Sequence, residues 1–410
     1  MDINQGPISY LARTNFRSQG QRFGIQQADR RAHLYVVGKT GTGKSNLLEL
    51  LARQDILAGR GFVLLDPHGD LVERLVPLAR EKRPQDLIYF DVSDREHPLG
   101  FNPLEQIAPE KRALAASGLL EAFKKIWADS WGPRSEHVLR AALLTLLEQP
   151  EATLADIPRL FSDAAFRKSA AAEVANPHVR DFWLREYEGY PARFRAEVIA
   201  PLQNKVGAFL TNPLLARILT QPRSDFKLGQ VMNQGKILLV NLAKGKIGED
   251  TASLLGALLV SRIGLAAMNR AELPESARRD FFVYLDEFHT FAGPSLAGML
   301  SELRKYRVGL ILSHQHFSQL DPAVLDAILG NVGTVIAFRV GLTEAQVLEQ
   351  EFFPVFSASD LTNLPNHAIY LKLLIDGRVS RPFSAETLPA GDFSIDKQLR
   401  KKEQISVAAQ

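Results

Sequence analysis

Apolar residues in this chain fall into two patterns, short runs typical of buried strands and longer stretches with helical spacing. Strand-like runs occupy residues 33–37, 61–66 and 87–91, and a helical segment at residues 71–80 separates the last two. Four further runs of this kind, each followed by a helical segment, occupy residues 236–242, 281–285, 309–313 and 334–338. The alternation predicts an α/β fold in which helices cover both faces of a mostly parallel sheet.

The alternation stops between residues 109 and 228, where the apolar spacing is almost entirely helical. The clearest helical segments there are residues 113–127, 135–147, 181–187 and 194–210. A stretch of this length is too long to be a loop within one compact sheet domain. We therefore predict an all-α domain inserted into the sheet domain.

The last strand-like segments, residues 368–375 and 378–383, are joined by Asp376-Gly377, a dipeptide typical of hairpin turns. We expect this hairpin to close the sheet. The predicted organisation has four parts. They are an N-terminal segment with the first part of the sheet domain at 1–108, the all-α insertion at 109–228, the second part of the sheet domain at 229–394, and a polar tail at 395–410.

Composition narrows the class of protein. The 410 residues are 46% hydrophobic and 23% charged, which are ordinary values for a globular protein with a sizeable core. The absence of cysteine excludes disulfides and thiolate metal sites, and it fits a reducing compartment. The longest apolar stretch, residues 254–268, is interrupted by Arg262, and residues 1–20 are polar. We therefore expect neither a membrane-spanning helix nor a signal peptide.

One segment, Gly38–Ser45, fits the phosphate-binding pattern G-x-x-x-x-G-K-[ST] at every fixed position. It follows a strand-like run and precedes an apolar helical segment, residues 46–52, so a glycine turn that merely caps a helix is the weaker interpretation. Backbone N–H groups of such a loop point at phosphate oxygens, and the helix N-terminus adds partial positive charge. We expect a nucleotide to be bound by Gly38, Thr40, Gly41, Thr42, Gly43, Lys44 and Ser45. Lys44 would reach the β and γ phosphates, and Ser45 would ligate Mg²⁺.

A second chemical feature is the pair Asp286-Glu287 at the end of an apolar strand. In a nucleotide hydrolase the first carboxylate holds Mg²⁺ and the second polarises the attacking water. Neighbouring side chains on a strand point to opposite sides, so both can serve one site only at the strand's end, where these two lie. Alternatively, Asp286 and Glu287 are only the solvated end of a strand. The phosphate loop upstream in the sequence makes this interpretation less favoured.

A third feature follows the strand at residues 309–313, where His314 and Gln315 stand next in the chain. An amide there can hydrogen-bond the γ phosphate or the attacking water, so Gln315 is the candidate sensor of hydrolysis. His314 and His316 lack a carboxylate or cysteine at ligand spacing, and we interpret them as ordinary turn residues.

Taken together, these motifs resemble those of the HerA/FtsK branch of RecA-like P-loop ATPases. The closest likeness is to the TraG-like coupling proteins of conjugative type IV secretion. The resemblance rests on the phosphate loop, the carboxylate pair and the sensor strand, and also on Asp66-Pro67-His68-Gly69-Asp70, residues 16–33 and residues 241–250. It covers most of the chain, and the helical insertion matches the family's helical domain in position and length.

The resemblance implies a hexameric ring that hydrolyses ATP between subunits and moves DNA of any sequence through a central channel. Each site would then need a cation from the neighbouring subunit. Arg304 stands where the family's trans-acting arginine falls, and Arg339 is the second candidate. The alternative is that these arginines lie on a solvated surface and have no role in a neighbour's site. Lys244 and Lys246, in a glycine-containing loop after a strand-like run, are the candidates for contact with DNA phosphates, with a solvated turn as the alternative.

This chain lacks the N-terminal transmembrane helices of anchored coupling proteins, so we expect a cytoplasmic protein that reaches the inner membrane through partners. Those partners would be secretion-channel or relaxosome proteins, or a nuclease. The favoured function is a DNA translocase. The alternatives are a soluble HerA-like DNA-processing helicase and a nucleotide-gated adaptor that recruits a nucleoprotein or effector with slow ATP turnover. A small-molecule kinase is disfavoured because a water-activating Glu287 suits hydrolysis.

Overall fold

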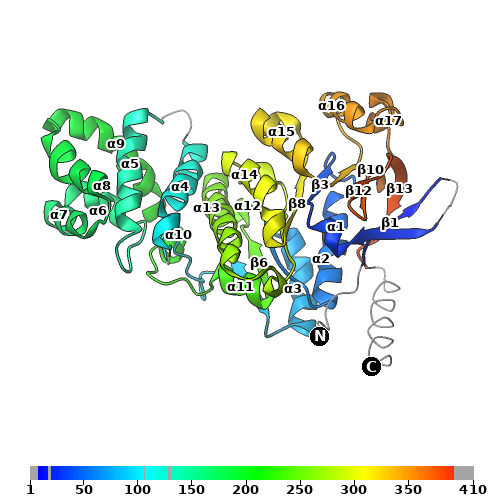
Figure 1. Ribbon diagram of the computed structural model, residues 1–410, viewed down its shortest axis with the longest axis horizontal. Coiled ribbons are helices and arrows are strands. Elements are labelled where there is room, and N and C mark those ends of the chain that lie inside the picture. The colour runs from blue at the N-terminus through cyan, green and yellow to red at the C-terminus, as the bar shows by residue number, and fades with distance from the viewer. Residues whose placement is uncertain (1–7, 17–19, 106, 128–130, 392–410) are drawn as a thin grey trace. The chain divides into compact units, whose positions relative to one another are not determined.

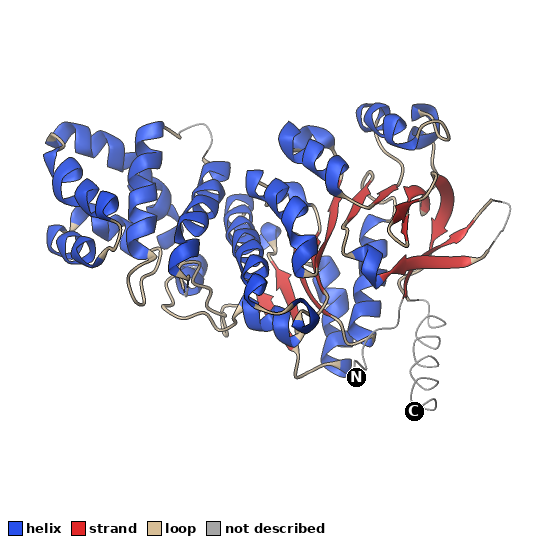
Figure 2. Ribbon diagram, viewed as in Figure 1, coloured by secondary structure: helices blue, strands red, loops and turns tan. Residues whose placement is uncertain are grey.

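The computed structural model describes residues 8–16, 20–105, 107–127 and 131–391. Contacts divide the chain into two units. The sheet unit comprises residues 1–89, 229–241 and 267–410, and the helical unit comprises residues 90–228 and 242–266. Strands gather in the sheet unit, whereas the helical unit is built almost entirely of helices (Figures 1 and 2). The predicted tail at 395–410 lies outside the described residues.

The sheet unit is organised around an eleven-stranded sheet with the order β2-β1-β13-β10-β9-β3-β8-β7-β4-β6-β5. The strands are β1 Ile8–Thr14, β2 Arg22–Gln26, β3 Leu34–Val37, β4 Gly61–Asp66, β5 Leu87–Asp91, β6 Ile237–Asn241, β7 Phe281–Leu285, β8 Val308–His314, β9 Thr334–Ala337, β10 Ala368–Lys372 and β13 Phe383–Thr387. The central pairs β9-β3, β3-β8, β8-β7, β7-β4 and β4-β6 are parallel. The pairs among β2, β1, β13, β10 and β9 are antiparallel.

Both faces of the parallel strands are buried, as their continuous apolar runs require. Leu34 and Val36 of β3 belong to the core cluster that also contains apolar residues of α2 and α3. Tyr35, between them, points to the other face, where its ring contacts Phe288 and Phe317. The helices of this unit are α1 Gln27–Arg30, α2 Lys44–Leu57, α3 Asp70–Lys82, α11 Leu228–Gln234, α14 Pro294–Glu302, α15 Pro322–Asn331, α16 Leu342–Phe352 and α17 Ala358–Thr362, with the short 3-10 helices η4 Asn269–Glu272, η5 Glu275–Ala277, η6 Phe288–Thr290, η7 Leu303–Tyr306 and η8 Phe317–Gln319.

The predicted hairpin is present but smaller than expected. Its turn residues Asp376 and Gly377 have φ angles of 49° and 76°, the left-handed values that a tight hairpin turn needs. It joins the two-residue strands β11 Leu374–Ile375 and β12 Arg378–Val379, which form a separate sheet. The neighbouring strands β10 and β13 pair with each other in the main sheet.

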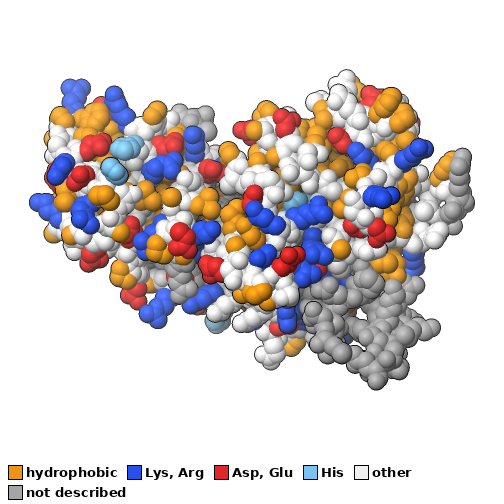
Figure 3. All heavy atoms as spheres, viewed as in Figure 1, with side chains coloured by type: hydrophobic (Ala, Val, Ile, Leu, Met, Phe, Trp, Pro, Cys, Tyr) orange, Lys and Arg blue, Asp and Glu red, His pale blue; other side chains and the backbone are white. Residues whose placement is uncertain are grey.

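The helical unit packs around aromatic side chains. Trp183 is fully buried, and its indole N–H donates to Thr145 Oγ1 at 2.7 Å. Its ring also contacts Tyr187. The helices are α4 Arg112–Ile126, α5 Pro133–Leu146, α6 Asp156–Ser162, α7 Ala164–Glu173, α8 Pro177–Asp181, the π-helix η3 Phe182–Tyr187, α9 Ala192–Leu210, α10 Pro213–Leu219, α12 Lys244–Ile247 and α13 Glu249–Met268, preceded by the 3-10 helix η1 Pro109–Lys111. On the face drawn in Figure 3, basic and acidic side chains are interspersed over this unit.

The helical unit takes in a second segment of the chain, residues 242–266, beside the continuous stretch that the sequence pattern marks. This segment carries α13, whose apolar residues such as Leu254, Leu258 and Leu259 are fully buried. The stretch Glu249–Glu272 is long and apolar enough to cross a membrane by length and composition, and 72% of its apolar window is buried. Burial of that kind is typical of a core helix.

Candidate nucleotide site

The site lies at the carboxyl edge of the parallel strands. In register, Val37 of β3 stands beside His314 of β8 on one side and Ala337 of β9 on the other. Leu285 of β7 stands beside Leu312 of β8. The segments that follow β3, β7 and β8 therefore emerge at the same edge. This register brings the phosphate loop, the carboxylate pair and Gln315 together, although they are far apart in the sequence.

Glycine is required at several points of the phosphate loop. Gly41 and Gly43 have φ angles of 76° and 122°, which disfavour any other residue. A Cβ on Gly38 would lie 2.6 Å from Cβ of Phe338, and one on Gly43 would lie 2.9 Å from Nδ1 of His367. The loop then leads directly into α2, whose first residue is Lys44. Its backbone therefore has the shape needed to turn N–H groups toward a phosphate.

The Lys44 ammonium is held inside this loop. Its Nζ donates to the carbonyl oxygens of Gly38 at 2.6 Å and Lys39 at 3.3 Å, and it lies 4.0 Å from Oε1 of Glu287. Burial lowers the pKa of Lys44, while the nearby carboxylates of Glu287 and Asp286 act in the opposite direction. The cation therefore lies within the loop that the sequence pattern predicts to bind phosphates.

A short chain of hydrogen bonds connects the three sequence motifs. Thr40 Oγ1 in the phosphate loop donates to Gln315 Oε1 at 2.6 Å, and Gln315 Nε2 donates to Glu287 Oε1 at 2.5 Å. The amide of Gln315 therefore touches both the loop that would bind the nucleotide and the carboxylate that would act on water. A sensor needs this position.

The two carboxylates share the site because the backbone turns sharply after β7. Glu287 has a φ of 44°, a left-handed conformation that costs about 1–2 kcal/mol for a residue with a Cβ. Its N–H donates to Asp286 Oδ1 at 3.1 Å. Backbone strain of this kind concentrates at functional sites, because surrounding structure has to maintain it. Sequence alternation alone would have sent these side chains to opposite sides.

Asp286 and Glu287 are buried together, and their negative charges are only partly balanced by nearby positive charge. Asp286 and Glu287 are 5% and 7% exposed. Burial, followed by the charges of Asp66 and Glu287, raises the pKa of Asp286 to about 7. Lys44 supplies one positive charge against them, so the donor set fits a divalent cation such as Mg²⁺. Among the described residues, no group of three His, Asp or Glu could hold a metal by itself.

Ser45 follows Lys44 at the start of α2, so the expected Mg²⁺ ligands Ser45 and Asp286 come from the two motifs that meet here. Asp66, from the β4 end of the same edge, accepts from the N–H groups of His68 and Leu71 at 2.9 and 2.8 Å. Its carboxylate thus fixes the turn into α3 while adding negative charge beside Asp286.

The two candidate arginines lie at opposite edges of the sheet. Arg304, in η7, is exposed and precedes β8, whose seven residues span roughly 20 Å. It is therefore remote from the phosphate loop of its own chain. Arg339 lies beside that loop, because its carbonyl accepts from the N–H of Lys39 at 2.8 Å. Its guanidinium donates to Leu364 O at 3.2 Å and Asn366 Oδ1 at 2.9 Å.

Two histidines beside the site have positions that the sequence did not indicate. His367 has a φ of 67°, donates its N–H to Thr42 O at 2.8 Å, and packs against Gly43. His314 is a buried strand residue and not a turn residue as we had interpreted it, and its Nδ1 lies 3.1 Å from Tyr35 Oη. Burial lowers the pKa of His314 to about 3, so the ring is neutral. The sequence signal for the left-handed backbone at His367 is the dipeptide Asn366-His367 just before β10, because asparagine is typical of such turns.

The DNA-contact candidates Lys244 and Lys246 belong to the helical unit. Their segment forms the single-turn helix α12 and not the open loop that its glycine suggested. Ala243, at its N-cap, has a φ of 43° and a ψ of 48°. Lys246 is exposed and Lys244 is half-buried.

Comparison with known proteins decides the family. Residues 22–352 match the family described as the type IV secretion-system coupling protein DNA-binding domain. The chain belongs to this family. The resemblance to type IV coupling proteins found in the sequence is therefore confirmed. No curated protein sequence was found to match the chain.

Solved structures show the fold shared by this coupling-protein family member. The bacterial conjugative coupling protein TrwBdeltaN70, in an unbound form, is 17% identical with a TM-score of 0.64, and the match covers 94% of each chain. Plasmid coupling protein TrwB with ADP and Mg²⁺ is 18% identical with a TM-score of 0.63, covering 90% of this chain and 86% of that one. VirB4 of Thermoanaerobacter pseudethanolicus is 13% identical with a TM-score of 0.61, covering 96% and 99%. They confirm the predicted fold class, a mostly parallel sheet flanked by helices with a helical domain.

Proposed function

We propose that this coupling-family protein is an ATP-hydrolysing motor that moves DNA through the central channel of a homohexameric ring. The observation that carries the proposal is the continuous contact from Thr40 through Gln315 to Glu287. It joins a phosphate loop to a carboxylate through an amide, and this arrangement is suited to hydrolysis of a bound triphosphate. The family description, a DNA-binding domain of type IV coupling proteins, supports DNA as the partner.

Each residue of the site has a distinct task in this proposal. The loop and Lys44 bind the phosphates. Glu287 accepts the proton of the attacking water, and Gln315 holds that water in line and responds to the loss of the γ phosphate. Mg²⁺, held by Ser45 and Asp286, would neutralise charge on the phosphate oxygens. TrwB was solved with ADP and Mg²⁺ on the same fold, which supports these ligands for this chain.

The placement of the arginines supports a site shared between copies. Arg304 stands at the edge of the sheet away from its own phosphate loop, so it would serve a neighbour's nucleotide. The backbone carbonyl of Arg339 contacts the loop of its own chain, so this arginine would act in cis. A repeated contact of one edge with the opposite edge of the next copy generates a ring when the rotation between copies closes, and the proposed hexamer is such a ring. Lys244 and Lys246 remain the proposed DNA contacts, and the cytoplasm the proposed location, with the membrane reached through secretion partners.

Hydrolysis rates measured with and without DNA test this proposal. We expect ring-sized particles whose ATPase rate rises when DNA of any sequence is added at low salt, and Lys44→Ala should abolish both rates. Particle size, measured for both proteins, checks that the variant still assembles. A rate that DNA leaves unchanged would instead favour the nucleotide-gated adaptor.

A further inference from the structure

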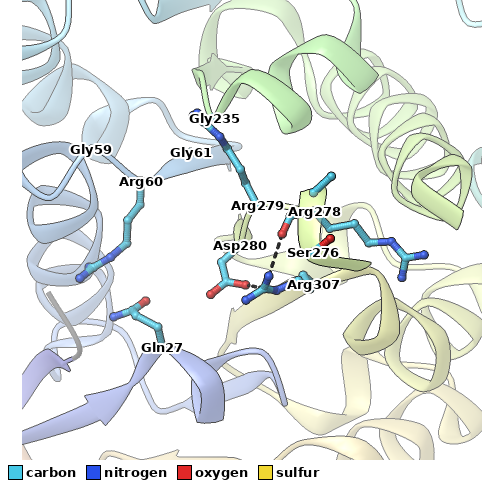
Figure 4. A pocket seen from close by; sticks show the side chains of 11 residues that line it. Gln27, Gly59, Arg60, Gly61, Gly235, Ser276, Arg278, Arg279, Asp280 and Arg307 are labelled. Atoms are coloured by element: carbon cyan, nitrogen blue, oxygen red, sulfur yellow. Dashed lines mark hydrogen bonds and ion pairs between the residues drawn. The ribbon is translucent and has the colours of Figure 1, made fainter. Parts of the chain in front are cut away.

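A second pocket lies in the sheet unit at the amino edge of the parallel strands (Figure 4). Its walls come from the residues just before β4, β6, β7 and β8, so it stands at the edge opposite to the phosphate loop. The lining residues are Gln27, Gly59, Arg60, Gly61, Gly235, Ser276, Ala277, Arg278, Arg279, Asp280 and Arg307. None of them belongs to the nucleotide site described above.

Two glycines shape the wall of this pocket. A Cβ on Gly61 would lie 2.6 Å from Cα of Gly235, so the two backbones approach closely only because side chains are absent. Gly235 has a φ of 69°, and a Cβ there would lie 3.3 Å from Nη1 of Arg279. Any larger residue at these positions would fill the space between the backbone and that arginine.

The side chains that line the pocket are strongly unbalanced in charge. They include the four arginines Arg60, Arg278, Arg279 and Arg307 and one carboxylate, Asp280. Arg60 is paired with the buried Asp55 at 3.1 Å, which leaves three arginines against Asp280. Asp280 Oδ1 accepts from Arg307 Nε at 2.9 Å and lies 3.6 Å from Arg31 Nε, so two guanidiniums share it.

The same charges act on Arg270, a buried arginine that donates to the carbonyl oxygens of Arg279 and Tyr306. Burial lowers the pKa of Arg270 to about 10; Asp280 acts to raise it, while the charges of Arg278 and Arg307 lower it further. A cation excess in a partly enclosed space attracts an anion.

Backbone carbonyls hold these guanidiniums in place. Arg278 donates to Leu273 O at 3.0 and 2.8 Å and to Lys305 O at 2.8 Å, and Arg279 donates to Gln234 O at 3.1 Å. Arg307 donates to Arg278 O at 3.0 Å, as Figure 4 shows. Neutral carbonyls fix Arg278 and Arg279 without cancelling their charge, whereas Arg307 is also paired with Asp280. An anion would therefore meet guanidiniums that have already lost most of their conformational freedom.

We infer that this pocket binds a phosphate-bearing anion at a site separate from the nucleotide loop. Guanidinium forks match phosphate oxygens in geometry and charge. The volume of about 150 Å³ is below the ~300 Å³ at which pockets begin to enclose whole drug-sized ligands, so one phosphate group fits better than a complete nucleotide. The phosphate is either a free ion or a phosphodiester of the DNA backbone. The inference holds whether or not the chain hydrolyses ATP.

Titration with inorganic phosphate tests the site directly. The full-length protein is first saturated with Mg²⁺ and a non-hydrolysable ATP analogue, so that the γ position of the nucleotide site is filled. Calorimetry should then show phosphate binding that Arg279→Gln weakens at least tenfold and Arg279→Lys weakens less, since lysine keeps the charge but loses the fork. Arg378→Gln, which removes an exposed arginine from β12, should leave the affinity unchanged.

Arg279 is exposed, so its substitution should leave the unfolding midpoint close to that of the wild type. No phosphate binding to the analogue-loaded protein, or equal affinities in Arg279→Gln and wild type, would overturn the inference. An equal loss in Arg279→Gln and Arg378→Gln would overturn it too, because it would reflect net charge alone. A short oligothymidylate that displaces the phosphate identifies the DNA backbone as the source, and failure to displace it identifies the free ion.

Discussion

The two edges of the central sheet differ in charge, and the proposed sharing of a site between copies depends on this contrast. At the carboxyl edge, Lys44 is the cation among Asp66, Asp286 and Glu287. At the amino edge, arginines surround Asp280, and Arg304 lies exposed beside them. In the proposed function, the carboxyl edge holds a triphosphate and a divalent cation and needs further positive charge at the moment of hydrolysis. The opposite edge of a second copy would supply that charge.

Of the substitutions that test the difference between the two edges, we expect one at the carboxyl edge to have the largest effect. Glu287→Gln keeps the shape of the side chain and its place beside Gln315 but removes the base, so hydrolysis should fall by roughly 10²–10⁴-fold. Nucleotide affinity should stay within a few-fold of wild type, because Lys44 and the loop are untouched. Single-turnover hydrolysis and equilibrium binding of a nucleotide analogue separate the two effects. Wild-type turnover in Glu287→Gln would show that Glu287 is not the general base.

The next effect concerns the support beneath the amino edge. Asp55 and Arg30 are both fully buried, and their two hydrogen bonds are each 2.7 Å. Asp55 also accepts from Arg60 at 3.1 Å and from Tyr284 Oη at 2.5 Å. Asp55→Ala leaves buried guanidiniums without this carboxylate, so the free energy of unfolding should fall by roughly 3–5 kcal/mol. Urea titration measures it.

The matched control is Glu386→Ala, which removes the carboxylate from the exposed pair of Arg13 and Glu386. An exposed pair contributes roughly 0–1 kcal/mol, so this variant should unfold close to the wild type. Similar losses in the two variants would mean that the buried network has no special role in holding the amino edge.

The smallest effect is a pH dependence at the amino side. His33 Nδ1 accepts from Leu310 N–H at 2.9 Å, so Nε2 carries the proton and donates to Leu300 O at 3.0 Å. Burial, opposed by the Leu300 bond and assisted by the charge of Arg304, lowers the pKa of His33 to about 4. The unfolded chain binds a proton at this residue near pH 6.5 and the folded chain does not. Stability is therefore lost as pH falls from about 6.5 toward 4.

Between pH 7 and pH 5 the loss assigned to His33 is about 2 kcal/mol. His33→Asn removes the titration, and asparagine tolerates the φ of 67° at this position. Urea midpoints at the two pH values should differ less in this variant than in the wild type. The exposed His68, changed to asparagine, should leave the difference intact. If the urea midpoints of His33→Asn differ between the two pH values as much as those of the wild type, a group other than His33 causes the pH dependence.

Much of the carboxyl edge could be predicted from the sequence, because the phosphate loop and the carboxylate strand have local patterns that require a strand end. The edge strands β1 and β2 could not, since β1 joins the sheet by antiparallel pairing with β13, as Thr387 opposite Ala12 shows, and β2 joins it through β1. The position of His367 against Gly43 is likewise set by tertiary packing. The arginine pocket collects residues from four strand starts, none of which is distinctive alone.

Complementation between two inactive variants tests the central claim, that the two edges meet between copies. Arg304→Ala should lower turnover roughly 10³-fold and Lys44→Ala should abolish it, each for reasons confined to one edge. In mixed rings roughly a quarter of the interfaces would pair an intact loop with an intact Arg304. We predict that mixing the two proteins restores ATPase activity well above either alone. A mixture no more active than its two components would contradict a site shared between neighbouring copies.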